Sequence, residues 1–415
     1  RISIFDMICL PQRILKKGHL AVLEYNLANE LLPRELKYRG SKTFRNGYLW
    51  DVEKLRNEFE ICPRCAEKSS VQCGKLHVIV REAPLREKPL WLRILKHRYY
   101  CKRCRKPFTE PVEGIWPRRR TTTHFRKAVA SDCTNYTNLS LVRKHHSCSS
   151  GFIYQVHYEV LKNKLNERKN IRWPKVIGID EHFFTRRNGY AEFATVFCDL
   201  KKRRLFEMCK GKDSKSIFKI IDQYPGRQEV EMVVIDLSNG YRSIVQKMFP
   251  NAKIIADKFH ALRLLTPAMM KLRKQINGNR LELKQRRLLL RNREDLKYFE
   301  KLEMDKFLEK HPELEELYFY KERLRIFYKS RNHRQARRQL ELFIKDLENS
   351  AQEAAQILGR TLKKWKEELI AYFGNGWTNG FTEATNGTAK ALQRRARGFR
   401  SFVNYRLKTL NACFY

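Results

Sequence analysis

The sequence contains no apolar run near the length of about 18–20 residues that a membrane-spanning helix requires, so we expect no membrane association. Its start, RISIFDMICLPQRILKK, has a short apolar patch but lacks both the extended apolar region and the cleavage site of a secretory signal. Internal repeats and long low-complexity tracts are absent as well. These absences favour a cytoplasmic protein.

Acidic residues are scarce relative to basic ones. The 415 residues include 86 Lys and Arg but only 45 Asp and Glu, which gives a formal net charge of +41. This excess indicates a polyanionic partner, most simply nucleic acid, because basic side chains neutralise phosphates and release their counterions. A basic protein of a ribosome or membrane surface is the alternative. The hydrophobic content of 42% argues for large packed cores instead, and the length suits two or three domains.

The cysteines do not form the pattern of a disulfide framework, because there are eleven of them and several lie in Cys-x-x-Cys pairs. Two such pairs can close a tetrahedral site of four thiolates around a structural Zn²⁺. The predicted ligands are Cys62, Cys65, Cys101 and Cys104.

The segments KLHVIV and WLRILKHRYY between these pairs are typical of the two strands of a hairpin. We therefore expect a zinc-binding module over residues 62–112, preceded by a lead-in of little pattern over 1–61. A site of four thiolates has no open position for catalysis, so its role would be to fold a module that contacts DNA or a partner. Three nearby residues are expected not to be ligands: Cys73, His77 and His97.

Residues 118–170 are basic and have a helical pattern. The run at Ser147–Gly151 predicts a short turn between two helices, and the second helix, with Tyr154 and His157 near its start, would suit a helix-turn-helix reader of the major groove. An ordinary helical linker fits the pattern nearly as well. At the start of this segment, WPRRR offers three candidate phosphate-binding residues: Arg118, Arg119 and Arg120.

From residue 174 the pattern is α/β. KVIGIDE predicts a first strand that ends at Asp180, VEMVVID a fourth that ends at Asp236, and AKIIAD a fifth that ends at Asp257. Functional groups gather at the carboxyl edge of such sheets. The order β-β-β-α-β-α-β is that of an RNase H-like domain, in which the first and fourth strands are neighbours. Asp180 and Asp236 would then face each other.

Two converging carboxylates repel unless a cation lies between them, and Mg²⁺ (or Mn²⁺) is the natural choice because it prefers oxygen ligands and bridges phosphates. Metal ions so held activate an attacking hydroxyl and stabilise a leaving oxygen. The candidate third acid is Glu383, on a helix expected to be capped at Thr382. Three further residues share its face at helical spacing and would follow a phosphate backbone: Asn386, Lys390 and Arg394, with Arg395 beside them.

These motifs together resemble a known family. In order they are CPRC…CKRC, IGIDE, VVIDLSNGYR, ADKFH and EATNGTAKALQRRARGF, and they resemble the DDE transposases of bacterial insertion sequences, most closely the ISL-three family. The resemblance covers roughly residues 60 to 410. It implies binding of terminal inverted repeats, strand cleavage by water and strand transfer by the 3′-hydroxyl, with Asp180, Asp236 and Glu383 as the catalytic triad and a homo-oligomer on DNA. One departure is Ala384, where the family more often has glycine.

Several single residues have competing interpretations. Glu181 is the alternative to Asp180 as a site residue. Because successive side chains of a strand point to opposite faces, only one of the two can lie in the site. We expect this to be Asp180 and expect Glu181 to pair with a basic neighbour. Asp199 suits a turn. Asp257 and His260 form a D-x-x-H unit that either orders the active site or simply caps a helix. Trp377 suits packing better than base stacking.

The stretch from 263 to 373 is dense in Leu, Lys, Arg and Glu and predicts an all-helical insertion between the second and third acids. Its basic run Lys284–Arg293 would favour some DNA contact. The expected architecture is thus an α/β RNase H-like catalytic domain, in two parts over 174–262 and 374–415, with a helical insertion, a zinc-binding module and a helix-turn-helix-like segment. The alternatives are an inactive or domesticated DNA-binding relative and a structure-selective nuclease without strand transfer.

Overall fold

A computed structural model describes residues 28–135, 138–167, 171–277 and 283–413. The chain divides into two compact units, Arg1–Val160 and Leu161–Tyr415. None of the helices among the described residues has the length and apolar character needed to cross a membrane.

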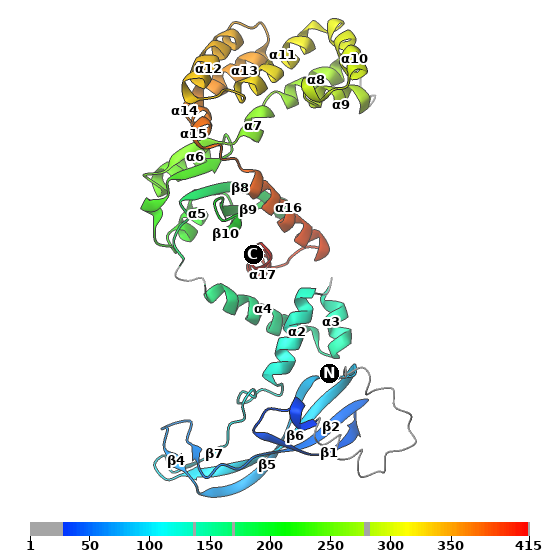
Figure 1. The fold of residues 1–415 in the computed structure, drawn as a ribbon, viewed down its shortest axis with the longest axis vertical. Coiled ribbons are helices and arrows are strands. Elements are labelled where there is room, and N and C mark those ends of the chain that lie inside the picture. Colours follow the sequence, from blue (N-terminus) through cyan, green and yellow to red (C-terminus); the bar gives the residue numbers. More distant parts are fainter. Residues whose placement is uncertain (1–27, 136–137, 168–170, 278–282, 414–415) are drawn as a thin grey trace, which may run out of the picture. The chain divides into compact units, whose positions relative to one another are not determined.

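The first unit is built on a five-stranded sheet (Figure 1). Its strands are β1 (Leu36–Phe44), β2 (Gly47–Lys54), β6 (Lys88–Cys101) and β5 (Gln72–Leu85), in that order, with β7 (Lys106–Thr109) paired to β6. Alternation along β6 buries Leu90, Leu92 and Ile94 in one core. The short strands β3 (Glu60–Ile61) and β4 (Lys68–Ser69) form a separate pair. The predicted hairpin is confirmed as β5 and β6.

The expectation of a lead-in with little pattern before residue 62 is wrong. Strand β2 pairs in parallel with β6, so part of the lead-in belongs to the same sheet as the cysteine module. The sequence of β1, LKYRGSKTF, hides this because only Leu36 and Tyr38 of that strand are buried.

Three helices follow: α2 (Thr123–Asn135), α3 (Leu139–His146) and α4 (Ser150–Asn166). The sequence predicted one helix before the turn, but there are two, because Asn138 caps α3 by accepting a hydrogen bond from the Leu141 N–H at 3.0 Å. The turn before α4 is confirmed, although it is shorter than expected. Ser147 takes the left-handed conformation, with φ 48°, and Gly151 already lies within α4.

The second unit contains a sheet of order β10-β9-β8-β11-β12. The strands are β8 (Val176–Arg187), β9 (Tyr190–Asp199), β10 (Arg204–Lys210), β11 (Met232–Ile235) and β12 (Lys253–Ala256). Strand β9 pairs antiparallel with both β8 and β10, and β11 runs parallel to both β8 and β12. The prediction that the first and fourth strands are neighbours is therefore confirmed.

Strand β8 does not end at Asp180 as expected. Its pairing with β11 stops at Gly178, one residue before the apolar run ends at Ile179, but its pairing with β9 continues to Arg187. Asp180 therefore lies within a long strand, just past the point where its parallel neighbour ends.

Alternation along β8 divides the core into two layers. Ile177 and Ile179 pack with α5 (Ser214–Ile221) and α6 (Asn239–Met248), whereas Val176 faces α16 (Gly380–Arg395) and α17 (Phe402–Ala412). The 3-10 turn η1 (Arg227–Glu229) precedes β11, and α7 (Lys258–Leu262) follows β12. Asp180 is on the α16 side of the strand.

Between α7 and α16 the described residues form helices and no strand, as predicted. The helices are α8 (Thr266–Asn277), α9 (Leu283–Leu290), α10 (Tyr298–Glu309), α11 (Pro312–Phe327), α12 (His333–Glu348), α13 (Glu353–Lys364), α14 (Lys366–Ile370) and α15 (Tyr372–Asn375), with η2 (Arg293–Asp295) after α9. Their apolar faces pack into the same hydrophobic core as the buried residues of α6.

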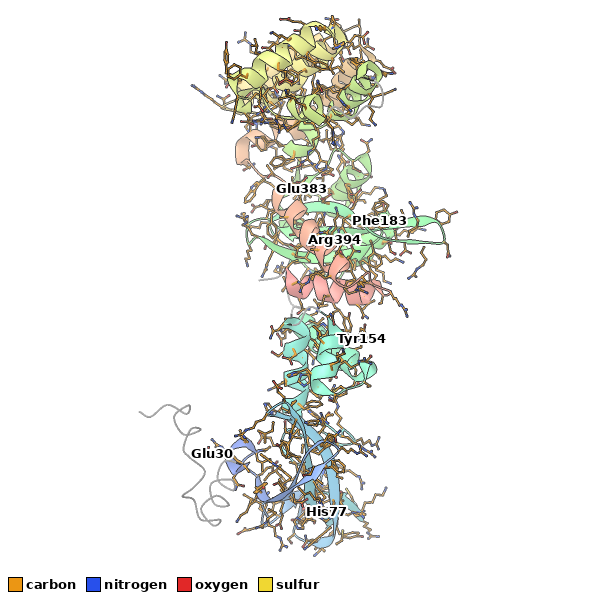
Figure 2. The ribbon with its side chains drawn as sticks, turned by 90° about the vertical axis from the view of Figure 1, so that its right-hand side faces the viewer. Glu30, His77, Tyr154, Phe183, Glu383 and Arg394 are labelled. Carbon is orange, nitrogen blue, oxygen red and sulfur yellow. The ribbon has the colours of Figure 1, made fainter. Side chains whose placement is uncertain are left out.

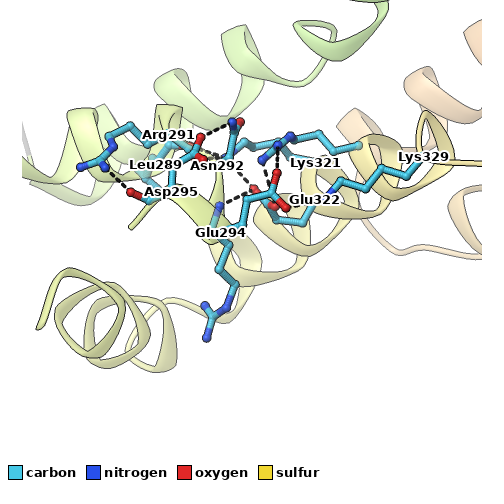
Figure 3. Close-up of polar contacts among 10 residues, drawn as sticks. Leu289, Arg291, Asn292, Glu294, Asp295, Lys321, Glu322 and Lys329 are labelled. Atoms are coloured by element: carbon cyan, nitrogen blue, oxygen red, sulfur yellow. Dashed lines mark hydrogen bonds and ion pairs between the residues drawn. The ribbon is translucent and has the colours of Figure 1, made fainter. Parts of the chain in front are cut away.

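The basic run at α9 contributes to this helical region itself (Figure 3). Lys284 pairs with Glu303 at 2.8 Å, and Arg291 pairs with Glu300 at 2.9 Å. The buried Lys321 donates from Nζ to the carbonyl oxygens of Leu289 and Arg291, at 2.9 and 2.5 Å, and so closes the carboxyl end of α9. Several of the charges predicted to favour DNA contact are therefore engaged within the helices.

Candidate active site

Asp180 is held from two sides. The Glu181 N–H donates to its Oδ1 at 2.8 Å, and the Asn386 side-chain amide donates to its Oδ2 at 2.7 Å. Burial, followed by the negative charge of Asp236, raises the pKa of Asp180 to about 7. The parallel register pairs Gly178 with Val234, so Asp180 and Asp236, each two residues further along, follow this pairing at the same level of the sheet, as the prediction that they face each other requires.

Asp236 directly follows the last residue of β11, and His260 lies against it. The His260 Nδ1 atom is 2.9 Å from Asp236 Oδ1 and 3.0 Å from Asp257 Oδ2. One N–H cannot serve both oxygens well, and the hydrogen bond goes to Asp257. Asp236 Oδ1 therefore forms a close ion pair with the imidazole and has no other hydrogen-bond donor among the described residues.

The D-x-x-H unit has both of the roles considered for it. Asp257 caps α7 by accepting from the His260 N–H at 3.1 Å, and it also accepts from the Asn379 N–H at 2.8 Å, which ties α7 to the start of α16. Contacts with Asp236 and then with Asp257 raise the pKa of His260 to about 10. The imidazole is therefore a cation at neutral pH, placed among carboxylates.

Glu383 joins this group from the first turn of α16. Its Oε1 atom is 3.9 Å from His260 Nδ1 and 3.8 Å from the Arg263 guanidinium. The structure thus brings together all three acids predicted from the sequence, around one histidine at the carboxyl edge of β11. Glu383 and Arg394 are both labelled on this helix in Figure 2.

Comparison with known proteins agrees with this geometry. Residues 177–409 match a family model described as a transposase, that of the ISL-three (ISL3) DDE transposases, and the matched range includes all three acids. The chain belongs to this transposase family. It is also 23% identical over 370 residues to the transposase for insertion sequence element IS1001 of Bordetella parapertussis, covering 84% of this chain and 87% of that protein.

Some predicted roles in this transposase need correction. Asn386 is buried rather than exposed along a groove, so it cannot follow a phosphate backbone as expected. Thr382 is buried inside α16 and does not cap it, because the helix begins at Gly380. Glu181 forms no ion pair with a basic neighbour among the described residues. It lies near the Tyr241 hydroxyl instead, and burial followed by this carboxylate raises the pKa of Tyr241 well above its usual range. His157 is buried, so it cannot read DNA from α4.

Other predicted roles are compatible with the structure. Lys390, Arg394 and Arg395 are exposed on α16. Asp199 ends β9 and accepts from the Lys202 N–H at 3.0 Å, as expected of a turn residue, and Trp377 packs against the core beside α16.

Three side chains that the sequence did not indicate fix α16 to β8. The Asn379 amide donates to the Ile179 carbonyl at 2.8 Å, and the Gln393 amide donates to the Phe184 carbonyl at 2.8 Å. The third, His182, bonds to Asn386. The three amides Asn379, Asn386 and Gln393 recur every seven residues, and this spacing was the available signal that one helix face meets a strand.

Gly178 permits this close approach. A Cβ atom at that position would lie 2.2 Å from Thr382 Oγ1 and 2.6 Å from Asn379 Oδ1. The glycine of the IGIDE motif therefore allows the helix that carries Glu383 to pack directly on the strand that carries Asp180.

The four predicted zinc ligands of the transposase also come together, in the first unit. Their sulfur atoms all lie within 4.8 Å of one another, and Cys65 Sγ is 3.6 Å from Cys101 Sγ. A hydrogen bond from the Arg64 backbone lowers the pKa of Cys62 to about 7, whereas contact with Cys65 raises the pKa of Cys104 to about 12, as expected when crowded thiols cannot all ionise without a cation between them. The three residues expected not to be ligands, Cys73, His77 and His97, lie outside this cluster.

The three arginines of the WPRRR motif are not equivalent. Arg118 and Arg120 are exposed, whereas Arg119 forms an ion pair with Glu159 on α4 at 3.2 Å. The side chains that α4 exposes near its start include Tyr154 and Gln155, and Tyr154 stacks on Tyr158 with ring centroids 6.1 Å apart.

Proposed function

We propose that this chain is a catalytically competent DDE transposase whose triad is Asp180, Asp236 and Glu383. The observation that carries the proposal is the convergence of these three carboxylates around His260, in a chain that belongs to the transposase family. A protein that only binds DNA would have no need to hold like charges together, since doing so costs free energy.

The donor set fits Mg²⁺ or Mn²⁺. Asp236 Oδ1 is buried and has no donor other than the His260 imidazole among the described residues, and both oxygens of Asp180 have a second lone pair beyond the hydrogen bond that each accepts. Hard oxygen ligands of this kind suit these ions. When bound, the ions would activate water or a 3′-hydroxyl and stabilise the leaving oxygen of the phosphodiester.

We also propose an RNase H-like architecture for the catalytic domain, with residues 263–373 as its helical insertion. The sheet order, with the first strand at the centre between the second and fourth, supports this assignment. The side-chain amides of α16 would fix the position of this helix along β8, and so the position of Glu383 relative to Asp180. His260, a cation beside Asp236, would reduce the repulsion among the acids.

DNA contact is assigned to the exposed cations. Lys390, Arg394 and Arg395 extend along α16 beyond Glu383 and would neutralise phosphates next to the cleavage point. In the first unit, Arg118 and Arg120 would contact phosphates, and α4 would read the terminal inverted repeat. The cysteine cluster would hold structural Zn²⁺, and the transposase would act as a homo-oligomer on paired ends.

The test is cleavage of a labelled duplex that carries the ends of the encoding insertion sequence, with Mg²⁺, by wild type and Asp236→Asn. We expect metal-dependent nicking at the end that is lost in the variant while duplex binding persists. Binding without cleavage by either chain, with Mg²⁺ or Mn²⁺, would instead identify an inactive relative. Cleavage without end specificity or joining to target DNA would identify a nuclease.

A further inference from the structure

Behind Asp180 lies a chain of hydrogen bonds made by buried side chains from three elements. Asn386 Nδ2 is 2.7 Å from Asp180 Oδ2, Asn386 Oδ1 is 2.8 Å from His182 Nδ1, and His182 Nε2 is 2.6 Å from the Tyr405 hydroxyl. Asn386 is on α16, His182 on β8 and Tyr405 on α17. All three side chains are at most 3% exposed.

The direction of each bond follows from the chemistry of the groups. The Asp180 carboxylate can only accept, so Asn386 must present its amide to it and its carbonyl oxygen to His182. That oxygen can only accept, which places the imidazole proton on Nδ1 of His182. The ring is buried and its hydrogen-bond partners include no carboxylate, so it is neutral and its Nε2 accepts from the Tyr405 hydroxyl.

The far end of the chain is itself fixed by packing. The Tyr405 ring is fully buried, stacks on Phe184 with centroids 5.1 Å apart, and contacts Phe402 and Phe399 at 6.2 and 5.2 Å. Its hydroxyl therefore has little freedom to turn away. Bonds in such a dry interior polarise one another, so a change at one end affects the other.

We propose that Tyr405, His182 and Asn386 form a directional positioning chain that sets the orientation and charge distribution of Asp180 as a metal ligand. The inference rests on the proposed function, because it assigns the chain a purpose at the catalytic carboxylate. These residues do not touch substrate, so they are positioning residues. The competing explanation is that they only stabilise the fold, as buried polar networks do elsewhere in this unit.

Two substitutions separate these explanations. Tyr405→Phe keeps the buried ring and removes only the hydroxyl, which is three hydrogen bonds away from Asp180. Tyr241→Phe is the matched control, because it also removes a buried tyrosine hydroxyl, one that lies 3.1 Å from Thr195 Oγ1 on the opposite face of the sheet from Tyr405. If the chain only stabilises the fold, both variants should behave alike in every assay.

The first readout is Mn²⁺ affinity of the zinc-loaded full chain, measured from the electron paramagnetic resonance signal of free Mn²⁺. We expect Tyr405→Phe to weaken binding about three- to tenfold, the effect of one hydrogen bond. Asn386→Ser, which removes the charge-assisted bond itself, should weaken it by roughly ten- to a hundredfold. Tyr241→Phe should bind as wild type does, and Asp180→Asn should abolish binding at this site.

The second readout is the Mn²⁺ concentration for half-maximal nicking of the end duplex, which should shift in the same order while duplex affinity stays constant. Equal Mn²⁺ affinity for wild type and Tyr405→Phe, with binding abolished by Asp180→Asn, would overturn the positioning chain and leave the proposed function intact. Mn²⁺ binding that is insensitive to Asp180→Asn would overturn both the metal site and the chain that serves it.

Discussion

Gly178→Ala should separate the packing of the active site from its chemistry. The added Cβ would lie 2.2 Å from Thr382 Oγ1 and 2.6 Å from Asn379 Oδ1, where ordinary contacts need about 3.5 Å. Neither neighbour can move aside cheaply, because Thr382 is fully buried and the Asn379 amide is bonded to β8. Helix α16 must therefore move away from the strand by about 1 Å.

Two magnitudes follow from that movement. Overpacking of this kind costs about 1–3 kcal/mol of unfolding free energy. For a unit of this size, each kcal/mol lowers the melting temperature by about 2–4 °C, so we expect a decrease of roughly 3–10 °C. Because Glu383 moves with the helix while Asp180 stays on the strand, cleavage should decrease by about a hundredfold, the usual effect of a 1 Å misplacement.

Gly387→Ala is the matched control on the same helix. A Cβ at Gly387 would have no heavy atom within 4 Å, and alanine is favoured over glycine in a helix by about 0.5–1 kcal/mol. The two substitutions should thus shift the calorimetric transition of the second unit in opposite directions. If Gly178→Ala melts at or above the wild-type temperature and cleaves normally, α16 does not depend on that glycine and the packing argument is wrong.

Three further predictions concern charge. Burial lowers the pKa of His182 in the folded state from 6.5 to about 4. Protonation of this one residue should therefore destabilise wild type by about 3 kcal/mol as the pH falls from 6.5 to 4. Urea unfolding at the two pH values should show a smaller loss of stability for His182→Gln. Replacing Arg394 and Arg395 together by alanine should reduce the slope of log duplex affinity against log salt concentration by about 1–2. Lys321→Met should cost about 1–3 kcal/mol in urea unfolding by leaving two buried carbonyls unbonded, whereas Lys310→Met, an exposed control, should be neutral.

The strand order and the three acids could be predicted because each signal was local. Asp180 and Asp236 follow apolar runs that only a buried strand explains, and Glu383 opens a helix rich in basic residues. The cysteine cluster was predictable for the same reason, since the spacing within each Cys-x-x-Cys pair sets the local geometry of two ligands.

What could not be predicted depends on partners distant in the chain. Strand β8 continues past Asp180 because β9 pairs with it as far as Arg187, and an apolar run cannot reveal such a partner. Asn386 was placed on the exposed face of α16 because it lies only three residues from Glu383. A rotation of about 60° around the helix separates the groove from the sheet, and helical spacing alone does not show which side of that boundary a polar residue takes.

The misplaced Asn386 indicates how the active site is held together. Three carboxylates that converge without a metal repel one another, so they cannot be the source of their own arrangement. Asp180 is fixed by the amide of Asn386 and the N–H of Glu181, and Asp257 joins the start of α16 to α7. The position of Glu383 is set by α16, which Gly178 allows to approach the strand. Amides, the buried Asp257 carboxylate and one glycine therefore fix the geometry of the three acids.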